Sequence, residues 1–320
     1  PLGYGLSQVM FALTGNLPMM ILSRLFSGIF AGATYSVAYG YVSDISERQM
    51  KSANIAKIGS IAIIGGALGA KIGGQVAVMN TTYPFILQLI LSIVVTGLLF
   101  FFLKDTEEDE EETKSKRLSD LKGLNPFSTF KYIKELDSSS KFFVLIIFMS
   151  GVGIFSYNSS IIYFLKFYKN VSSNTIGTFT MLSSLLAFLG TSFLLKWMLK
   201  KHKEISIYRV FVTLGILIMI LSLVILEKGL IPYVLFSIYT MSYEIVRTLG
   251  NSILANRFKR DQGKILGIAT GMGSLGMAVG SLISGYLLAM DSYLPFIVNI
   301  VMMSLVIGLL IYNNFINTKK

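Results

Sequence analysis

The sequence contains no cysteine and a single histidine, and these absences exclude several kinds of chemistry. Without cysteine, the chain can form neither a disulfide bond nor a thiolate-ligated metal site. The histidine, His202, lies in a basic connection between apolar runs, so it cannot join a Ser-His-Asp set at their depth, and we assign it no role. A nucleotide-binding loop is also missing. We therefore expect no enzymatic activity, no metal and no cofactor.

Charged residues are scarce as well. They make up 14% of the 320 residues, whereas hydrophobic residues make up 53%, and the mean hydropathy is +0.66. A soluble protein of this length would need far more charge to cover its surface. The composition therefore predicts a protein that lies in a lipid bilayer.

Apolar runs of about 20 residues, the length that crosses a bilayer as a helix, recur along the whole chain. Ten candidates predict an all-α, polytopic membrane protein, although the first is too short to cross. They lie at 3–15, 18–43, 52–78, 83–103, 142–166, 174–196, 205–226, 230–256, 264–288 and 292–313.

The net charge of +11 is distributed unevenly between the connections. If alternate connections face the same side, one side holds 22 Lys and Arg residues and the other holds three. This bias places the basic side in the cytoplasm and argues against nucleic acid as a partner. We expect a multi-pass protein of the bacterial cytoplasmic membrane with its C-terminus in the cytoplasm.

One long polar segment, residues 104–141, divides the chain. Its acidic run at 107–112 is followed by a basic stretch, and we interpret it as a cytoplasmic linker, with a regulatory or partner-binding role as the alternative. Four runs precede it, within 1–103, and six follow it, within 142–320. Because the chain starts at Pro1 inside an apolar run, we expect it to be truncated at its N-terminus. If the two halves are a duplication, the four-to-six division means that the first bundle lacks two helices.

A pattern of small residues occurs twice, 211 residues apart. Small residues let helix backbones approach closely in lipid, and a duplicated bundle is typical of secondary transporters built from two halves. We predict that the two copies pack against each other as a moving, gating interface. Gly65, Gly69, Gly73 and Gly74 return as Gly276, Gly280, Ser284 and Gly285, and Pro84-Phe85 returns as Pro295-Phe296.

Four ionisable side chains lie well inside the apolar runs: Arg24, Lys71, Glu244 and Arg247. Each costs about 2.5–3.5 kcal/mol or more at mid-bilayer, so each should face a partner or a water-filled cavity. Glu244 and Arg247 are three residues apart on one helical face. They form either a neutralised structural pair or a cavity-lining pair in which Glu244 binds a proton or a cationic substrate.

Two of these charges, Arg24 and Lys71, and one further charge, Asp44, have two interpretations each. Arg24 either tunes a nearby carboxylate or relays protons, or it is a structural bridge. Lys71 either extends toward the outer surface or enters the transport pathway, where it would disfavour cations. Asp44, at the cytoplasmic end of its run, either holds an interdomain ion pair or flanks the membrane.

Four segments carry a likeness to one family. Residues 23–32 place an Arg four residues before a Gly, residues 41–48 follow with Tyr-Val-Ser-Asp-Ile and Arg48, and residues 124–127 read Leu-Asn-Pro-Phe. Residues 65–74 are similar to the antiporter motif GxxxGPxxGG, with Ala70 in place of its proline. The chain resembles the major facilitator superfamily, and within it the twelve-helix drug:proton antiporters, such as bacterial tetracycline-efflux proteins.

The resemblance implies a major facilitator fold in which this chain supplies helices 3 to 12. It also implies a monomer that exchanges a small amphipathic compound, as in multidrug efflux, for protons by rocking two bundles around a midplane cavity. Arg24 would tune the proton site. The alternatives are a facilitator that imports a sugar, nucleoside or organic acid, and a non-transporting sensor. The few Asn and Gln residues in the runs favour an apolar pocket and hence the exporter.

Overall fold

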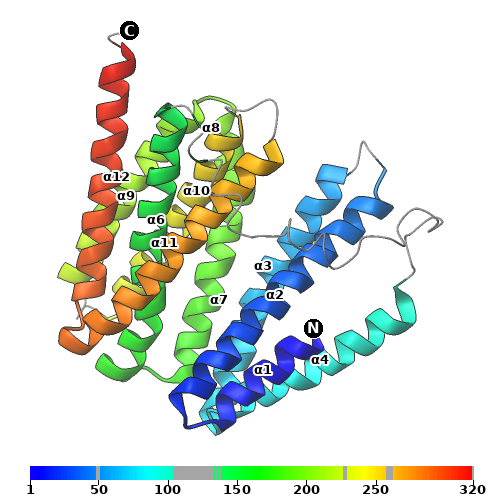
Figure 1. Cartoon of the computed structure of the whole chain (residues 1–320). Coiled ribbons are helices and arrows are strands. Elements are labelled where there is room, and N and C mark those ends of the chain that lie inside the picture. Colours follow the sequence, from blue (N-terminus) through cyan, green and yellow to red (C-terminus); the bar gives the residue numbers. More distant parts are fainter. Residues whose placement is uncertain are drawn as a thin grey trace. The chain divides into compact units, whose positions relative to one another are not determined.

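The computed structural model describes residues 1–47, 51–103, 133, 136, 138–225, 229–256 and 262–318, which form helices joined by short connections (Figure 1). The predicted all-α fold is confirmed, and the helix bounds follow the apolar runs to within a few residues. The helices are α1 (Leu2–Leu13), α2 (Leu17–Ile45), α3 (Lys51–Met79), α4 (Tyr83–Phe102), α6 (Ser138–Tyr163), α7 (Ser173–Leu189), α8 (Leu195–Leu199), α9 (Glu204–Val224), α10 (Ile231–Asn256), α11 (Gln262–Met290) and α12 (Leu294–Thr318).

Within the described residues, eight helical stretches are long and apolar enough to cross a membrane. Helix α1 is too short, as the sequence predicts. Helix α10 is long enough, at about 39 Å for its 26 residues, but it is not among the eight. Its C-terminal half contains Glu244, Arg247 and Asn251, so this half of the helix is less apolar than a typical membrane span.

Prolines mark the beginnings of four helices. Pro18, Pro84, Pro232 and Pro295 each occupy the second residue of their helix. The first-turn amides have no acceptor inside the helix, so proline, which lacks that amide, is tolerated there and has the right φ angle. These positions allow short connections between consecutive membrane helices.

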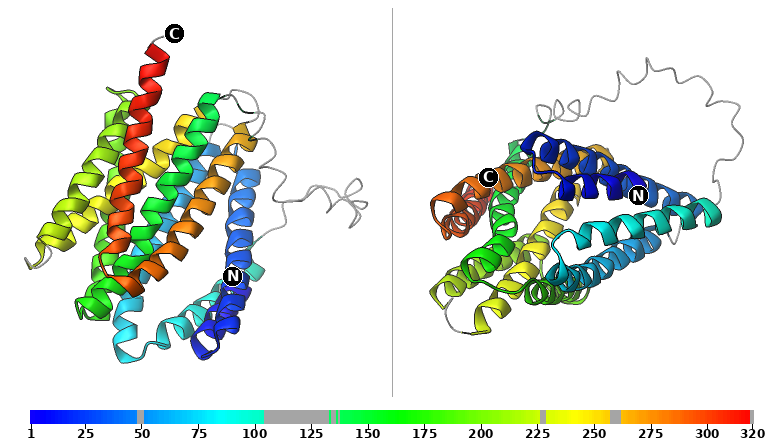
Figure 2. Two further views of the ribbon diagram at one scale, coloured as in Figure 1. Left: turned by 60° about the vertical axis from the view of Figure 1, so that its left-hand side comes forward. Right: turned by 90° about the horizontal axis from the view of Figure 1, so that it is seen from below.

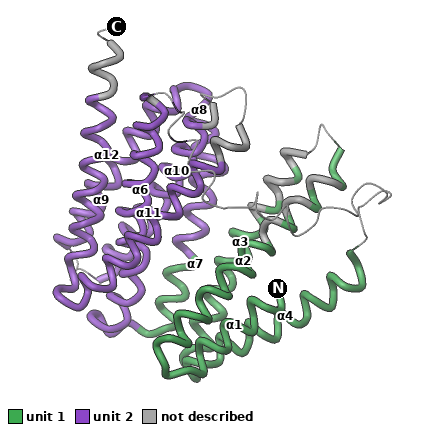
Figure 3. Tube along the Cα trace, in the orientation of Figure 1, with its two compact units in different colours: residues 1–116, 172–181 green, residues 117–171, 182–320 purple. Residues whose placement is uncertain are grey.

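The chain forms two compact units (Figure 3): residues 1–116 with 172–181, and residues 117–171 with 182–320. In the first unit, α1 packs against α2 and α4, and α3 packs against the same two helices. In the second unit, α6 lies between α11 and α12 (Figure 2). The predicted linker, 104–141, lies almost wholly outside the described residues, so it and the division into 1–103 and 142–320 stay predictions.

The 211-residue repeat extends to the helix ends and the turns. Both bounds of α11 lie 211 residues after those of α3, and α12 begins 211 residues after α4. In the first copy, Asn80 Oδ1 accepts a 2.9 Å hydrogen bond from the Thr82 amide. In the second, Asp291 Oδ1 accepts a 2.7 Å bond from the Tyr293 amide. The same turn therefore joins the two helices in both copies.

Helices α6 and α11 contact each other through their backbones. A Cβ on Gly276 would meet the carbonyl oxygen of Phe148, and one on Gly280 would meet the carbonyl oxygen of Val152. A Cβ on Gly151, in α6, would lie 2.8 Å from the Gly273 carbonyl oxygen. Glycine is needed here because any larger residue would force the two helices apart.

Candidate functional site

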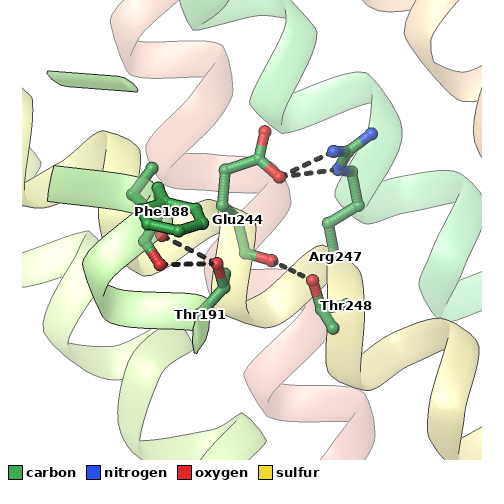
Figure 4. Close-up of polar contacts among 6 residues, drawn as sticks. Phe188, Thr191, Glu244, Arg247 and Thr248 are labelled. Atoms are coloured by element: carbon green, nitrogen blue, oxygen red, sulfur yellow. Dashed lines mark hydrogen bonds and ion pairs between the residues drawn. The ribbon is translucent and has the colours of Figure 1, made fainter. Parts of the chain in front are cut away.

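A charged pair lies at the middle of α10. Arg247 donates two hydrogen bonds to Glu244 Oε2, from Nη2 at 2.7 Å and from Nε at 3.0 Å. The side chain of Glu244 is 24% exposed and that of Arg247 is 55% exposed. Among the described residues, the other carboxylate oxygen, Oε1, accepts no hydrogen bond (Figure 4). One oxygen of the carboxylate is thus occupied and the other is free to bind a proton or a donor group.

Figure 4 draws the pair together with Phe188, at the end of α7, and Thr191, in the turn that follows α7. A π-helical turn at Gly190–Leu194 interrupts the helix there, and a Cβ on Gly190 would collide with the Met241 side chain of α10. Thr191 Oγ1 donates to the carbonyl oxygens of Ala187 and Phe188. Such π turns are often found at functional sites. Here the turn and its glycine let α7 approach α10 closely, one turn from Glu244.

Beside the pair, a cavity of about 90 Å³ opens between α6, α9, α10 and α11. Its wall includes the guanidinium-bearing side chain of Arg247 and, one turn further, Asn251. Ser150 and Tyr208, whose hydroxyls lie 3.1 Å apart, add polar groups to a lining that is otherwise mostly apolar. The cavity has the composition of a small-molecule site, an apolar surface with a few fixed polar groups.

A buried network stiffens the unit around this site. Asn299 Nδ2 donates to the Gly153 carbonyl oxygen at 2.7 Å and to the Tyr239 hydroxyl at 2.5 Å. Tyr157 packs edge-on against Tyr239, with ring centroids 4.7 Å apart, and its ring also contacts Phe296. These side chains are all almost fully buried. Hydrogen bonds between buried side chains help to fix the packing of their helices, here α6, α10 and α12, although Asn299 Oδ1 has no hydrogen-bond partner among the described residues.

Arg24 lies in the first unit, where its partners are on α1. Its Nη1 donates a 3.0 Å hydrogen bond to Gln8 Oε1, and its guanidinium lies 3.7 Å from the centre of the Phe11 ring. Gln8 is buried and donates in turn to Ser27 Oγ at 2.9 Å. Among the described residues Arg24 therefore bridges helices α1 and α2 through an amide and a ring, and its predicted role beside a proton site stays a prediction.

Lys71 is partly buried and hydrogen-bonded to α7. Its Nζ donates to Asn174 Oδ1 and to Thr178 Oγ1, both at the start of α7 and in the same unit. Both predicted roles of Lys71, extension toward the outer surface and entry into the transport pathway, stay predictions.

The glycines of the first copy differ in their surroundings. A Cβ on Gly74 would lie 2.6 Å from the Ser173 carbonyl oxygen, in α7, whereas at Gly65, Gly69 and Gly73 it would meet open space among the described residues. In the second copy, a Cβ on Gly285 would meet open space among the described residues. The close approaches of both copies are made to other helices, so packing of the two segments against each other stays a prediction.

Two other predicted positions add little to the site. Asp44 lies in the last turn of α2, but its side chain is outside the described residues, so its ion pair stays a prediction. His202 is exposed in the connection between α8 and α9. In the part of the chain that the structure describes, no group of three His, Asp or Glu side chains could hold a metal ion.

Sequence reasoning missed several polar partners inside the helices. They are Gln8, Asn174, Thr178 and Asn299, each bonded to a residue of another helix. Amides are rare in these apolar runs, and an amide that is costly to bury should have a partner. The scarcity of amides could therefore have pointed to Gln8, Asn174 and Asn299, but it does not predict which residues they bind.

Comparison with known proteins identifies the family. The model of the Major Facilitator Superfamily matches residues 2–259. The chain belongs to this superfamily. It is therefore a multi-pass membrane protein and a secondary transporter, not an enzyme, and its substrate is a small molecule.

Distant relatives of this superfamily member include proteins named for drug resistance. It is 22% identical to the Multidrug resistance protein 2 of Bacillus subtilis over 299 residues, which cover 92% of the chain and 72% of the relative. It is 33% identical to the Quinolone resistance protein NorA of Staphylococcus aureus over 99 residues, which cover 29% of the chain and 26% of the relative. An uncharacterised MFS-type transporter of Methanocaldococcus jannaschii is 23% identical over 89% of the chain and 72% of that protein.

Solved structures share the fold of this transporter. The human organic anion transporter MFSD10 superposes with a TM-score of 0.61 at 20% identity, covering 96% of this chain and 74% of that one. A D-xylose–proton symporter superposes with a TM-score of 0.66 at 13% identity, covering 97% and 77%. At such identities the likeness establishes the major facilitator fold alone.

Proposed function

We propose that this transporter exports small amphipathic compounds in exchange for protons by alternating access. The observation that carries the proposal is the Glu244–Arg247 pair, in which one carboxylate oxygen is held by Arg247 and Arg247 itself lines a mostly apolar cavity. The names of the distant relatives, a multidrug and a quinolone resistance protein, agree with export of such compounds.

The pair suits an exchange mechanism because a proton and a substrate would compete for it. Protonation of Glu244 removes the charge that holds Arg247, so the guanidinium is released toward the cavity that it lines. A substrate that carries a donor or positive charge binds better to the deprotonated carboxylate. Each ligand therefore favours a different state of the site, which is the condition for coupling the two fluxes.

The remaining features of the proposal concern the whole protein. We place it in a bacterial cytoplasmic membrane as a monomer, with its basic connections and C-terminus in the cytoplasm. Arg24 and the glycines of residues 65–74 and 276–285 are proposed to act in coupling and gating, respectively.

Export is tested in bacteria that lack their own efflux pumps and express the native gene. We expect lower steady-state accumulation of ethidium, a quinolone or tetracycline than in cells with an empty vector, and loss of that difference when an uncoupler collapses the proton gradient. Efflux that survives the uncoupler would rule out proton coupling. Accumulation of a labelled sugar, nucleoside or organic acid, without export of the three drugs, would favour the importer.

A further inference from the structure

The ammonium of Lys71 joins α3 to the first turns of α7. Its Nζ lies 2.8 Å from Asn174 Oδ1 and 2.6 Å from Thr178 Oγ1, two acceptors that are four residues apart and hence neighbours on one face of α7. The Thr178 hydroxyl donates its own hydrogen to the Asn174 carbonyl oxygen at 2.9 Å. A lone pair of Thr178 Oγ1 is therefore left to accept from Lys71.

The helix backbones are unusually close beside this contact. A Cβ on Gly74 would lie 2.8 Å from Gly177 Cα, and a Cβ on Gly177 would lie 2.6 Å from the Ala70 carbonyl oxygen. Since real Cβ atoms do not approach so closely, both positions need glycine. The absence of side chains at Gly74 and Gly177 brings α7 within reach of Lys71.

The acceptors of this ammonium are neutral. Lys71 lies about 12 Å along α3 from its end at Met79, at a depth where an unbound charge is costly. An amide and a hydroxyl satisfy it without a buried carboxylate. A contact of this kind can open without leaving an uncompensated negative charge, unlike a buried ion pair.

We propose that Lys71 is a positioning residue for transport, a latch that holds α3 against α7 in one conformation and releases it in the other. Residues 172–181 of α7 group with the first unit, whereas the rest of the helix belongs to the second. Because α7 runs without interruption across this boundary, a movement of the second unit that carries the whole helix would pull Asn174 and Thr178 away from α3. The inference rests on alternating access, but not on the direction of transport or on protons.

The distance between α3 and α7 can be measured with spin labels, because residues 1–320 contain no cysteine that would react with the label. Cysteines introduced at the exposed positions Val78 and Thr175, one on each helix, would be the only thiols for nitroxide labels within residues 1–320, and any cysteine that the native gene encodes outside them would be replaced by serine. Pulsed electron resonance then gives the distance distribution between α3 and α7. With Lys71 present we expect a short-distance population to dominate. Lys71→Met should shift the ratio of long to short distances about tenfold toward long, as expected for loss of a charge-assisted hydrogen bond.

Matched variants separate a latch from a general defect. Lys71→Arg should restore the short population, Asn174→Leu should reproduce the shift, and Asn174→Asp should move it the opposite way by turning the contact into an ion pair. Lys200→Met, which removes an exposed cytoplasmic charge, should change nothing. If Lys71→Met folds and leaves the distances unchanged, or if Lys200→Met shifts them equally, the latch is overturned.

The distances do not depend on the substrate. Failure of ethidium export with an intact Lys71-dependent shift would contradict the proposed exporter and leave the latch standing. Intact ethidium export without a Lys71-dependent shift would overturn the latch and leave the proposed exporter standing. If Lys71→Met does not fold, Lys71→Gln, which keeps a donor without the charge, should give an intermediate distribution, and a distribution equal to the unsubstituted protein would overturn the role of the charge.

Discussion

Glu244→Gln should reduce uphill export of ethidium at least tenfold while leaving downhill exchange largely intact. Glutamine has nearly the shape of the protonated acid, so it keeps an oxygen for Arg247, but it can neither bind nor release a proton. A transporter fixed in this state can still move its substrate down a gradient, because the conformational change does not require the lost charge. Transport into inverted membrane vesicles, with and without respiration, measures both activities.

Asp291→Asn is the matched control for this substitution. It also replaces a carboxylate with an amide, but Asp291 lies in the connection before α12, where its Oδ1 holds a turn. The corresponding residue of the first copy is already an asparagine, Asn80, and it makes the same bond. We therefore expect normal uphill export from Asp291→Asn. Full uphill export from Glu244→Gln would remove Glu244 from the coupling site.

Gly276→Ala should clearly lower the thermal stability of the protein. The added methyl group would meet the Phe148 carbonyl oxygen, a backbone atom that cannot rotate away, so α6 and α11 must separate along their shared face. Overpacking of this kind costs about 1–3 kcal/mol, and more where backbone must move. Thermal unfolding of the purified protein, followed by size-exclusion chromatography after heating, measures the loss.

The same helix provides the control. Gly285 lies nine residues further along α11, where a Cβ would find open space among the described residues. Gly285→Ala should therefore be neutral or slightly stabilising, because alanine is the better helix former. Equal melting temperatures for the two variants would show that α6 and α11 are not held in backbone contact at Gly276.

The helices and their order could be predicted from the sequence because each requirement is local. An apolar run must be about 20 residues long to cross a bilayer, and the run at 83–103 predicts α4 (Tyr83–Phe102) to within one residue. The repeat could be predicted for the same reason, since Pro84-Phe85 and Pro295-Phe296 keep their spacing. The run at 230–256 likewise predicts α10 (Ile231–Asn256) to within one residue, although α10 is not among the eight helical stretches apolar enough to cross a membrane.

The partners of polar side chains could not be predicted, because they depend on which helices meet. Glu244 and Arg247 share a helix, so their spacing of three residues predicts the contact that the structure contains. Lys71 and Asn174 are 103 residues apart, and no local pattern relates them. The π turn at Gly190–Leu194 also leaves no period in the sequence, although it sets how closely α7 approaches Glu244.

The central claim, proton-coupled export, is tested most directly with the purified protein in liposomes whose membrane potential is clamped. An imposed pH gradient should then drive ethidium toward the acidic side, and the reverse gradient should drive it the other way, with proton movement that depends on ethidium. Ethidium flux that is equal with and without the gradient, in a protein that binds ethidium, would contradict the account.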